Sequence, residues 1–293
     1  MPIKHLVISG GGPSMIQTLG AIQHLEDKEF ISLKNIESIY GTSAGAIVGV
    51  LISLGYDWET INDYIIKRPW HDVFKFKIGL QPILDAYANK GIFDIKTIEK
   101  CFKPLFDAKD ISMDIVLEDF YKLSHIELHF FSFELNEYKI QDISYLTHPK
   151  LPILTALHMT CSLPVLVTPV CIDDKCYLDG GVSCNYPVNY CIESGKITDE
   201  ILGLKNHSWY QQTPIDSNST IIDFLLNFIF KAVYNVNTDH NQQQLKNELI
   251  CDVTGLSFEG LLSALSSIDV RRELRTSGIN SAETFLSKLK DSV

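Results

Sequence analysis

The chain has 293 residues, a formal net charge of −11 and 45% hydrophobic residues. This length allows one large domain or one domain with an added subdomain, and the hydrophobic content is enough for a full core. The acidic balance argues against general nucleic-acid binding and against strong attraction to anionic membranes.

The first 55 residues predict a β-α-β-α order. Residues 5–9 form a strand pattern, and a helical pattern follows over about residues 14–26. A second short strand pattern ends at Gly41, and the apolar run 46–52 predicts a buried helix that stops near Gly55. Each of the two strands is therefore followed by a glycine-containing turn and a helix.

The remainder of the chain mixes predicted helices, strands and loops. In chain order we expect a mainly helical region over 56–125 with a loop near 69–79, a strand pair over 127–133 and 139–141, a helix over 153–159, a hairpin of 166–172 with 175–178, a helix over 187–194, a polar loop over 204–219, and helices over 221–236 and 259–265.

The segment 221–236 is apolar on nearly every face, which favours a buried helix packed on the core. A lid or membrane-docking helix over a ligand pocket, with the preceding polar stretch as its hinge, is the alternative.

A glycine-flanked serine lies between the second strand and its helix. Gly41-Thr42-Ser43-Ala44-Gly45 has small residues on both sides of the serine, which let the backbone make a tight strand-to-helix turn. Such a turn exposes the hydroxyl, and the helix N-terminus adds partial positive charge where an oxyanion would form. A chance glycine-rich turn is the alternative, but the strand-turn-helix context favours a nucleophile.

A glycine run, Gly10-Gly11-Gly12, lies between the first strand and its helix. Glycine leaves N–H groups unhindered, so a bound oxygen can approach closely. A dinucleotide-binding loop is disfavoured because Met15 stands where a third glycine is needed, and a phosphate-cradling loop lacks its Gly-Lys-Ser/Thr ending. With Ser43 one βαβ unit downstream, an oxyanion hole is the better interpretation.

An acidic residue, Asp179, ends a later strand pattern and is followed by Gly180 and Gly181. Open α/β sheets place their sites at the carboxyl ends of strands, which favours a functional carboxylate. An ordinary Asp-Gly turn is the commonest role of that dipeptide, so the position in the chain leaves both interpretations open.

Taken together, these motifs give the chain a resemblance to the patatin-like phospholipases. Four blocks match in order over residues 5–190: the glycines Gly10, Gly11, Gly12 and Gly20; the serine motif Gly41 to Gly45; the segment Thr160 to Pro164 with Pro169; and Asp179, Gly180, Gly181, Asn185 and Pro187. The resemblance implies a three-layer α/β/α patatin-like fold with a mainly parallel central sheet and a helical C-terminal region.

The resemblance also implies hydrolysis of lipid carboxylic esters by a Ser–Asp dyad, as in a phospholipase A or lysophospholipase. Ser43 would carry the acyl group and Asp179 would be the base. The expected substrate is a phospholipid or another acyl-ester lipid, with peripheral membrane contact and with no nucleic acid, cofactor or metal. The supporting backbone would comprise an oxyanion hole at Gly10, Gly11, Gly12 and Ala44, and turns shaped by Gly41, Gly45, Gly180 and Gly181.

Two departures from the family pattern keep other hypotheses open. Ser14 and Met15 replace a basic residue and a glycine, which allows a weakly active or inactive lipid-binding or regulatory protein on the same fold.

A third hypothesis is an α/β-hydrolase-type esterase with a Ser–Asp–His triad that uses His207 or His240. It is disfavoured because Ser43 follows too few strands and because both histidines lie in polar surroundings.

We expect an acyl-hydrolase domain over 1–203 and a loop and helical extension over 204–293 that packs on it.

The seven cysteines are an odd number, and Cys171 and Cys176 are spaced too widely for a redox pair. Reduced thiols in a cytoplasmic protein, peripheral on membranes, are the simplest interpretation. We identify no secretory signal before the glycine run and no apolar run of the ~20 residues that span a bilayer.

Overall fold

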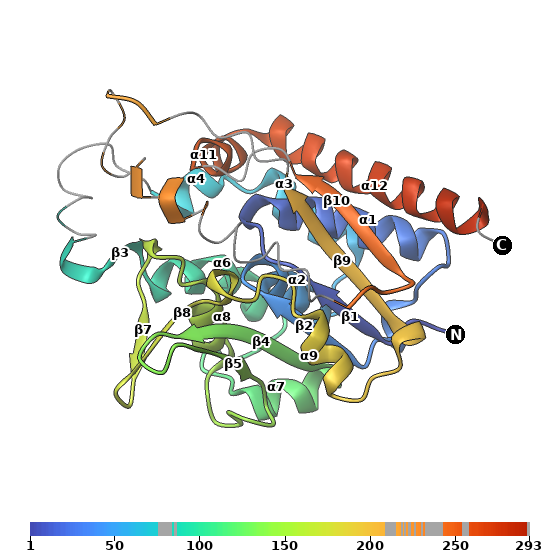
Figure 1. Cartoon of the computed structure of the whole chain (residues 1–293), viewed down its shortest axis with the longest axis horizontal. Coiled ribbons are helices and arrows are strands. Elements are labelled where there is room, and N and C mark those ends of the chain that lie inside the picture. The colour runs from blue at the N-terminus through green and yellow to red at the C-terminus, as the bar shows by residue number, and fades with distance from the viewer. Residues whose placement is uncertain are drawn as a thin grey trace.

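The computed structural model describes residues 1–75, 84, 87–208, 243–253 and 258–291, together with residues 215–217, 219, 221, 224–225, 227–229 and 231. Its centre is a sheet with the strand order β10-β9-β1-β2-β4-β8-β7, and β5 also pairs with β4 (Figure 1). The strands are β1 (His5–Ile8), β2 (Ser38–Thr42), β4 (Glu127–Glu134), β5 (Lys139–Ile143), β7 (Val170–Ile172), β8 (Lys175–Asp179), β9 (Ile201–Ser208) and β10 (Glu248–Val253).

The sheet is mainly parallel. Strands β10, β9, β1, β2 and β4 are parallel neighbours, whereas β5 and β8 are antiparallel to β4, and β7 is antiparallel to β8. A separate pair joins β3 (Gly91–Phe93) to β6 (Val165–Val167). The predicted strand over 166–172 is therefore two strands that belong to different sheets.

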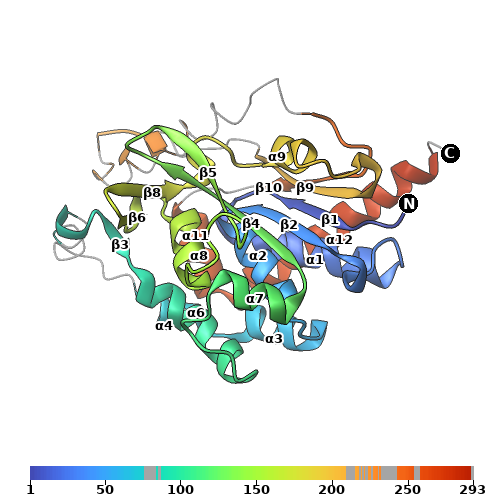
Figure 2. The ribbon, with the colours of Figure 1, turned by 90° about the horizontal axis from the view of Figure 1, so that it is seen from below.

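Helices cover the central sheet on both faces. They are α1 (Met15–Asp27), α2 (Ala44–Ser53), α3 (Trp58–Lys67), α4 (Trp70–Val73), α6 (Ile95–Asp107), α7 (Leu117–Ser124), α8 (Ile153–Cys161), α9 (Val188–Glu193), α11 (Phe258–Ser266) and α12 (Ile268–Asp291). Figure 2 shows α9 on one side of β1 and β9, with α1 and α2 on the other. The layers form the predicted three-layer α/β/α arrangement with a helical C-terminal region.

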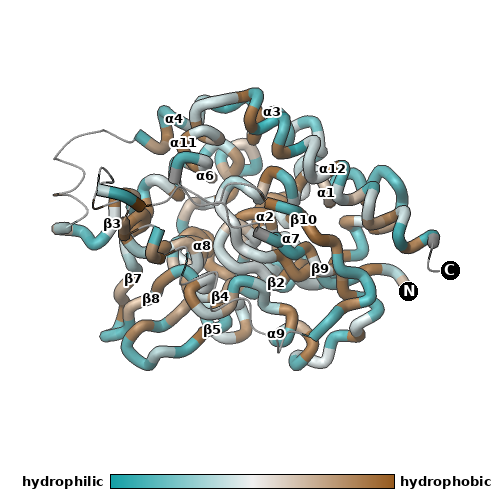
Figure 3. The backbone as a smooth tube through the Cα atoms, turned by 45° about the horizontal axis from the view of Figure 1, so that its top comes forward, coloured by the Kyte–Doolittle hydropathy of each residue, from teal (hydrophilic) through white to brown (hydrophobic). Residues whose placement is uncertain are grey.

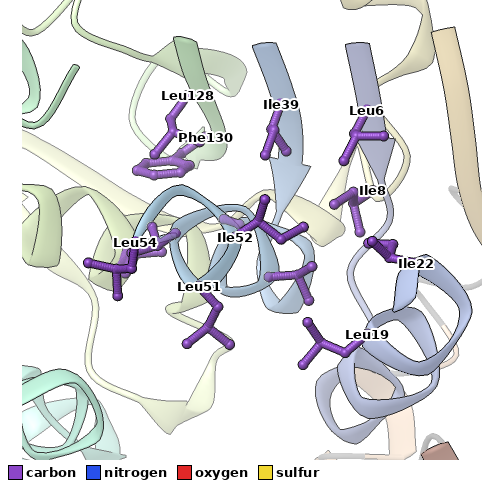
Figure 4. Close-up of a cluster of buried hydrophobic side chains, with 14 of the residues drawn as sticks. Leu6, Ile8, Leu19, Ile22, Ile39, Leu51, Ile52, Leu54, Leu128 and Phe130 are labelled. Carbon is purple, nitrogen blue, oxygen red and sulfur yellow. The ribbon is translucent and has the colours of Figure 1, made fainter. Parts of the chain in front are cut away.

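Strand alternation divides the core between the two faces. Leu6 and Ile8 of β1 face α1 and α2, where they meet Leu19 and Leu51 (Figure 4). The intervening Val7 faces the smaller cluster on the side of α9. The hydrophobic residues of strand β1 thus lie in the interior on both faces of the sheet. The outer helix α12 is mostly hydrophilic along its length (Figure 3).

The C-terminal part differs from the sequence prediction. Residues 204–208 belong to strand β9 rather than to a loop, and β9 lies between β1 and the unpredicted strand β10. The proposed division at residue 203 thus falls inside a strand of the central sheet. The longest helix, α12, was also unpredicted; it packs along α1, with Gly278 next to the backbone of Gln17.

The hairpin β7–β8 corrects the prediction that all cysteines are reduced thiols. Its register places Cys171 opposite Cys176, and the two form a disulfide. Spacing along the chain was a poor guide because a tight antiparallel turn brings residues five apart into a cross-strand pair. Among the described residues the other cysteines are free thiols.

The apolar segment 221–236 lies largely outside the described residues. Three of its described side chains, Ile221, Phe224 and Phe228, are more than half exposed, at 60%, 52% and 64%. These residues are therefore not part of a buried core helix, which was the favoured prediction for the segment.

Candidate active site

Ser43 occupies a sharp turn between β2 and α2. Its backbone has φ 53° and ψ −120°, a strained conformation for a residue other than glycine. The turn is tight because Gly45 packs against β1, where an added Cβ would lie 2.9 Å from the carbonyl carbon of Ile8. A strained serine at a helix N-terminus is the geometry that the serine motif predicts.

Thr160, from the end of α8, holds this turn in place. Its side-chain oxygen accepts a hydrogen bond from the Ser43 amide at 2.9 Å and donates to the Phe131 carbonyl at 2.5 Å. Thr160 is fully buried, so both bonds are shielded from water. The backbone of Ser43 is thereby tied to strand β4 through one hydroxyl.

Asp179 reaches Ser43 because β8 lies in line with β2. Strands β2 and β8 pair with the same edge of β4: β2 pairs with β4 as far as Phe131, and β8 pairs with β4 from Ser132 onward. Strand β5 pairs with the opposite edge of β4. The last residues of β2 and β8, Thr42 and Asp179, therefore meet end to end. This places the carboxylate beside the serine although β8 runs antiparallel to β4.

The Asp179 carboxylate is buried and partly satisfied. The Gly181 amide donates to its Oδ1 at 2.7 Å. Burial raises the pKa of Asp179 from 3.8 to about 6, while hydrogen bonds from the Ser43 side chain and the Gly181 amide oppose this rise. The group is therefore a stronger base than an exposed aspartate when it is ionised.

Three of the residues predicted to form an oxyanion hole, Gly11, Gly12 and Ala44, line the same cavity as Ser43. The amides of Gly11 and Gly12, and the Ala44 amide in the first turn of α2, donate to no acceptor among the described residues. The Gly10 amide instead donates to the Asn185 carbonyl at 3.0 Å. Of the four predicted oxyanion donors, three are thus available and Gly10 is committed elsewhere.

A cavity of about 320 Å³ opens from this point into the interior. Gly11, Gly12, Ser43, Ala44 and Asp179 all line it. The rest of its wall is almost entirely apolar and comes mainly from α1, α2, α3, α4, α6, α8 and α11. Such a lining suits a hydrocarbon chain whose polar end is held at Ser43.

The histidines of the alternative triad do not join this group in the described part of the chain. His207 lies on β9, is exposed and contacts Asp252 at 3.1 Å. It does not line the cavity, and His240 lies outside the described residues. The described ranges contain no cluster of three potential metal ligands and no helix long and apolar enough to cross a membrane.

Sequence reasoning missed several residues at the site. Thr160 and Cys161 belonged to a matching block but received no role; a hydrogen bond to the Ser43 side chain lowers the pKa of the Cys161 thiol, although burial raises it more. Asn206 carried no signal because its strand was not predicted. The apolar wall from α11 was also unforeseen, since contacts between distant segments leave no local pattern.

Comparison with known proteins identifies the family of the chain. The model of the family described as patatin-like phospholipase matches residues 6–192. The chain therefore belongs to the patatin-like phospholipase family, a family of lipid hydrolases.

Individual relatives are distant. A probable lipid hydrolase, 463L, of Invertebrate iridescent virus 6 is 25% identical over 227 residues, which cover 73% of this chain and 76% of that protein. The uncharacterized protein YqhO of Bacillus subtilis (strain 168) is 28% identical over 200 residues, or 62% of this chain and 64% of that protein.

Among solved structures, a chain of the heterodimeric ExoU–SpcU complex of Pseudomonas aeruginosa has a TM-score of 0.50 at 16% identity. The match covers 98% of this chain but 52% of that one, so the present chain spans about half the length of its structural relative. At this identity the likeness concerns the fold alone.

The Thr160 contacts lead to a first prediction. Thr160→Val keeps the volume but removes the acceptor for the Ser43 amide, so we expect ester hydrolysis to fall about tenfold or more as the serine loses its position. Thermal unfolding should also show a loss of about 1–3 kcal/mol from the unsatisfied buried amide. Ser53→Ala, which removes a buried hydroxyl bond at the far end of α2, is the control and should retain activity.

Proposed function

We propose that this protein is a lipid acyl hydrolase of the phospholipase A or lysophospholipase type, acting through an acyl-Ser43 intermediate with Asp179 as the base. The observation that carries the proposal is the meeting of a strained serine, a buried carboxylate of raised pKa and uncommitted amides at one wall of an apolar cavity. Family membership supports the lipid as the substrate class.

In the proposed reaction, Ser43 Oγ attacks the ester carbonyl carbon while Asp179 accepts the hydroxyl proton. The negative charge that develops on the carbonyl oxygen is stabilised by the amides of Gly11, Gly12 and Ala44. Asp179 then gives its proton to the departing alcohol. Water, deprotonated by Asp179, then attacks the carbonyl carbon of the acyl-serine. Asp179 returns the proton to Ser43 Oγ as the acyl–oxygen bond breaks and the fatty acid leaves. Each charge that develops has a protein partner, so the steps require no metal.

The environment supports this use of an aspartate. A carboxylate of pKa 3.8 is a weak base for a serine hydroxyl, and burial at the cavity wall raises the pKa of Asp179 to about 6. The α2 dipole and the amide donors act more strongly in the same water-poor surroundings. We infer that the acyl chain fills the cavity and that the headgroup stays outside it, in peripheral contact with a membrane.

Covalent labelling tests the proposal without a choice of substrate. A fluorophosphonate probe should label the wild-type protein on Ser43, as located by peptide mass spectrometry, and should leave Ser43→Ala unlabelled. Labelling elsewhere, or none in wild type, would instead favour a lipid-binding or regulatory protein on the same fold.

A further inference from the structure

Two asparagine side chains hold the carbonyl oxygen of Gly10. Asn206 Nδ2 donates to it at 3.0 Å, and Asn185 Nδ2 donates at 3.2 Å. The Asn206 amide also donates to Ser14 Oγ at 2.7 Å, so both of its hydrogens are used. The Gly10 carbonyl is thus fixed on the side of the loop where β9 ends.

The orientation of this carbonyl determines where the next amide points. The Gly10–Gly11 peptide is trans, so its C=O and N–H point in opposite directions. Gly11 lines the cavity and Gly10 does not. Asn185 also lines the cavity, but Asn206 does not. With the carbonyl held toward Asn206, the Gly11 N–H is turned toward the cavity.

We propose that Asn206 is a positioning residue that orients the Gly11 amide for the oxyanion; this inference rests on the function proposed above. It acts through the Gly10 carbonyl and contacts no substrate itself. A donor that is preorganised in this way needs no reorientation as the charge develops, which is the source of its effect on the rate.

Asn206 is itself placed by the central sheet. It follows the β1–β9 pairing, in which Ile8 aligns with Leu204, and its backbone amide donates to Ser9 Oγ at 2.8 Å. The fit to the loop is close: a Cβ added to Gly11 would lie 2.6 Å from Asn206 Nδ2. The side chain is therefore anchored on a strand and rests directly against the glycine that it orients.

The same contact accounts for the unusual residue at position 14. Ser14 stands where the family pattern has a basic side chain, and it is buried with its hydroxyl accepting from Asn206. In this chain Asn206 of β9 and Asn185 supply the donors that hold the glycine loop, so the loss of the basic residue does not leave the loop unsupported.

The test compares Asn206→Ala and Asn206→Asp with Asn247→Ala. Asn206→Asp keeps the side-chain shape and loses the donors. Asn247 is a matched control, since its Nδ2 also donates two hydrogen bonds, here to the carbonyls of Asp199 and Ile201 at the opposite end of β9. The readouts are kcat and KM for a soluble p-nitrophenyl ester, thermal unfolding, and the crystal structure of Asn206→Ala.

We expect both Asn206 variants to lose about 10²-fold in kcat while KM changes by less than about threefold, and Asn247→Ala to keep its kcat. The Gly10–Gly11 peptide should be turned in the Asn206→Ala crystal. An unchanged kcat would overturn the role of Asn206 and leave the proposed function intact. So would an unchanged Gly10–Gly11 peptide in a variant whose loss of activity is explained by its loss of thermal stability. Wild-type turnover that does not depend on Ser43 would overturn the proposed function first and this inference with it.

Discussion

Ser43→Ala should lower ester hydrolysis by about four to six orders of magnitude while leaving the fold intact. The variant removes the only atom that forms the proposed acyl intermediate, and the remaining amides and cavity cannot replace a nucleophile. It also removes a hydrogen bond to Asp179 without adding bulk, so the melting temperature should change little. Release of p-nitrophenol from a short-chain ester, followed with enzyme in excess, measures the effect.

Ser183→Ala is the matched control, because Ser183 is an exposed serine a few residues beyond Asp179. It should hydrolyse the ester as the wild type does. If Ser43→Ala kept more than about one per cent of the wild-type rate, Ser43 would not be the nucleophile.

Asp179→Asn should abolish hydrolysis and, at the same time, stabilise the protein at neutral pH. The amide cannot accept the serine proton, so we expect a loss of at least about 10³-fold in kcat. The stability gain has a separate origin: the pKa of Asp179 is raised from 3.8 to about 6 by burial, so the charged form is disfavoured in the folded state. At about 1.4 kcal/mol for each pKa unit, a neutral replacement should raise the melting temperature measurably.

The same pKa sets two opposite pH dependences. The folded wild type holds the Asp179 proton more tightly than the unfolded chain, so the destabilising contribution of this group fades as the pH falls from about 6 to about 4, and the stability advantage of Asp179→Asn over wild type should shrink. Over that window kcat/KM should fall, because the protonated carboxyl cannot act as a base. Calorimetry and a pH–rate profile on the soluble ester measure the two trends.

Asp174→Asn, at the exposed turn of the same hairpin, is the control and should alter neither the rate nor the pH profile. A wild-type rate that stays constant down to pH 4.5, or an Asp179→Asn variant that turns over normally, would remove Asp179 from the mechanism.

Local patterns in the sequence were sufficient for the parts of the fold that carry the serine. The runs before Gly10 and Gly41 are short apolar strands, and the apolar helix after Ser43 is buried on nearly every side. These elements depend on neighbours in sequence, so periodicity and glycine placement predict them. The fold class and the family could be inferred from the same segments.

The elements that escaped prediction depend on contacts between distant residues. Helix α12 contains Gly278 and is polar overall, which weakens a helical pattern, yet the glycine permits close packing on α1. Strand β9 ends in polar residues such as Asn206 because its last part supports the glycine loop rather than the core. Strand β8 lies in line with β2 because the two strands pair with successive parts of β4. This depends on the register of pairing between distant strands, which no local sequence pattern predicts.

Metal-independent hydrolysis through Ser43 is tested most directly by the release of fatty acid from mixed phospholipid vesicles in the presence of EDTA, with wild type and Ser43→Ala side by side. We expect the wild type to release fatty acid and Ser43→Ala to release none above background. Equal release by the two proteins, or wild-type release that EDTA abolishes, would contradict a metal-independent acyl hydrolase that acts through Ser43.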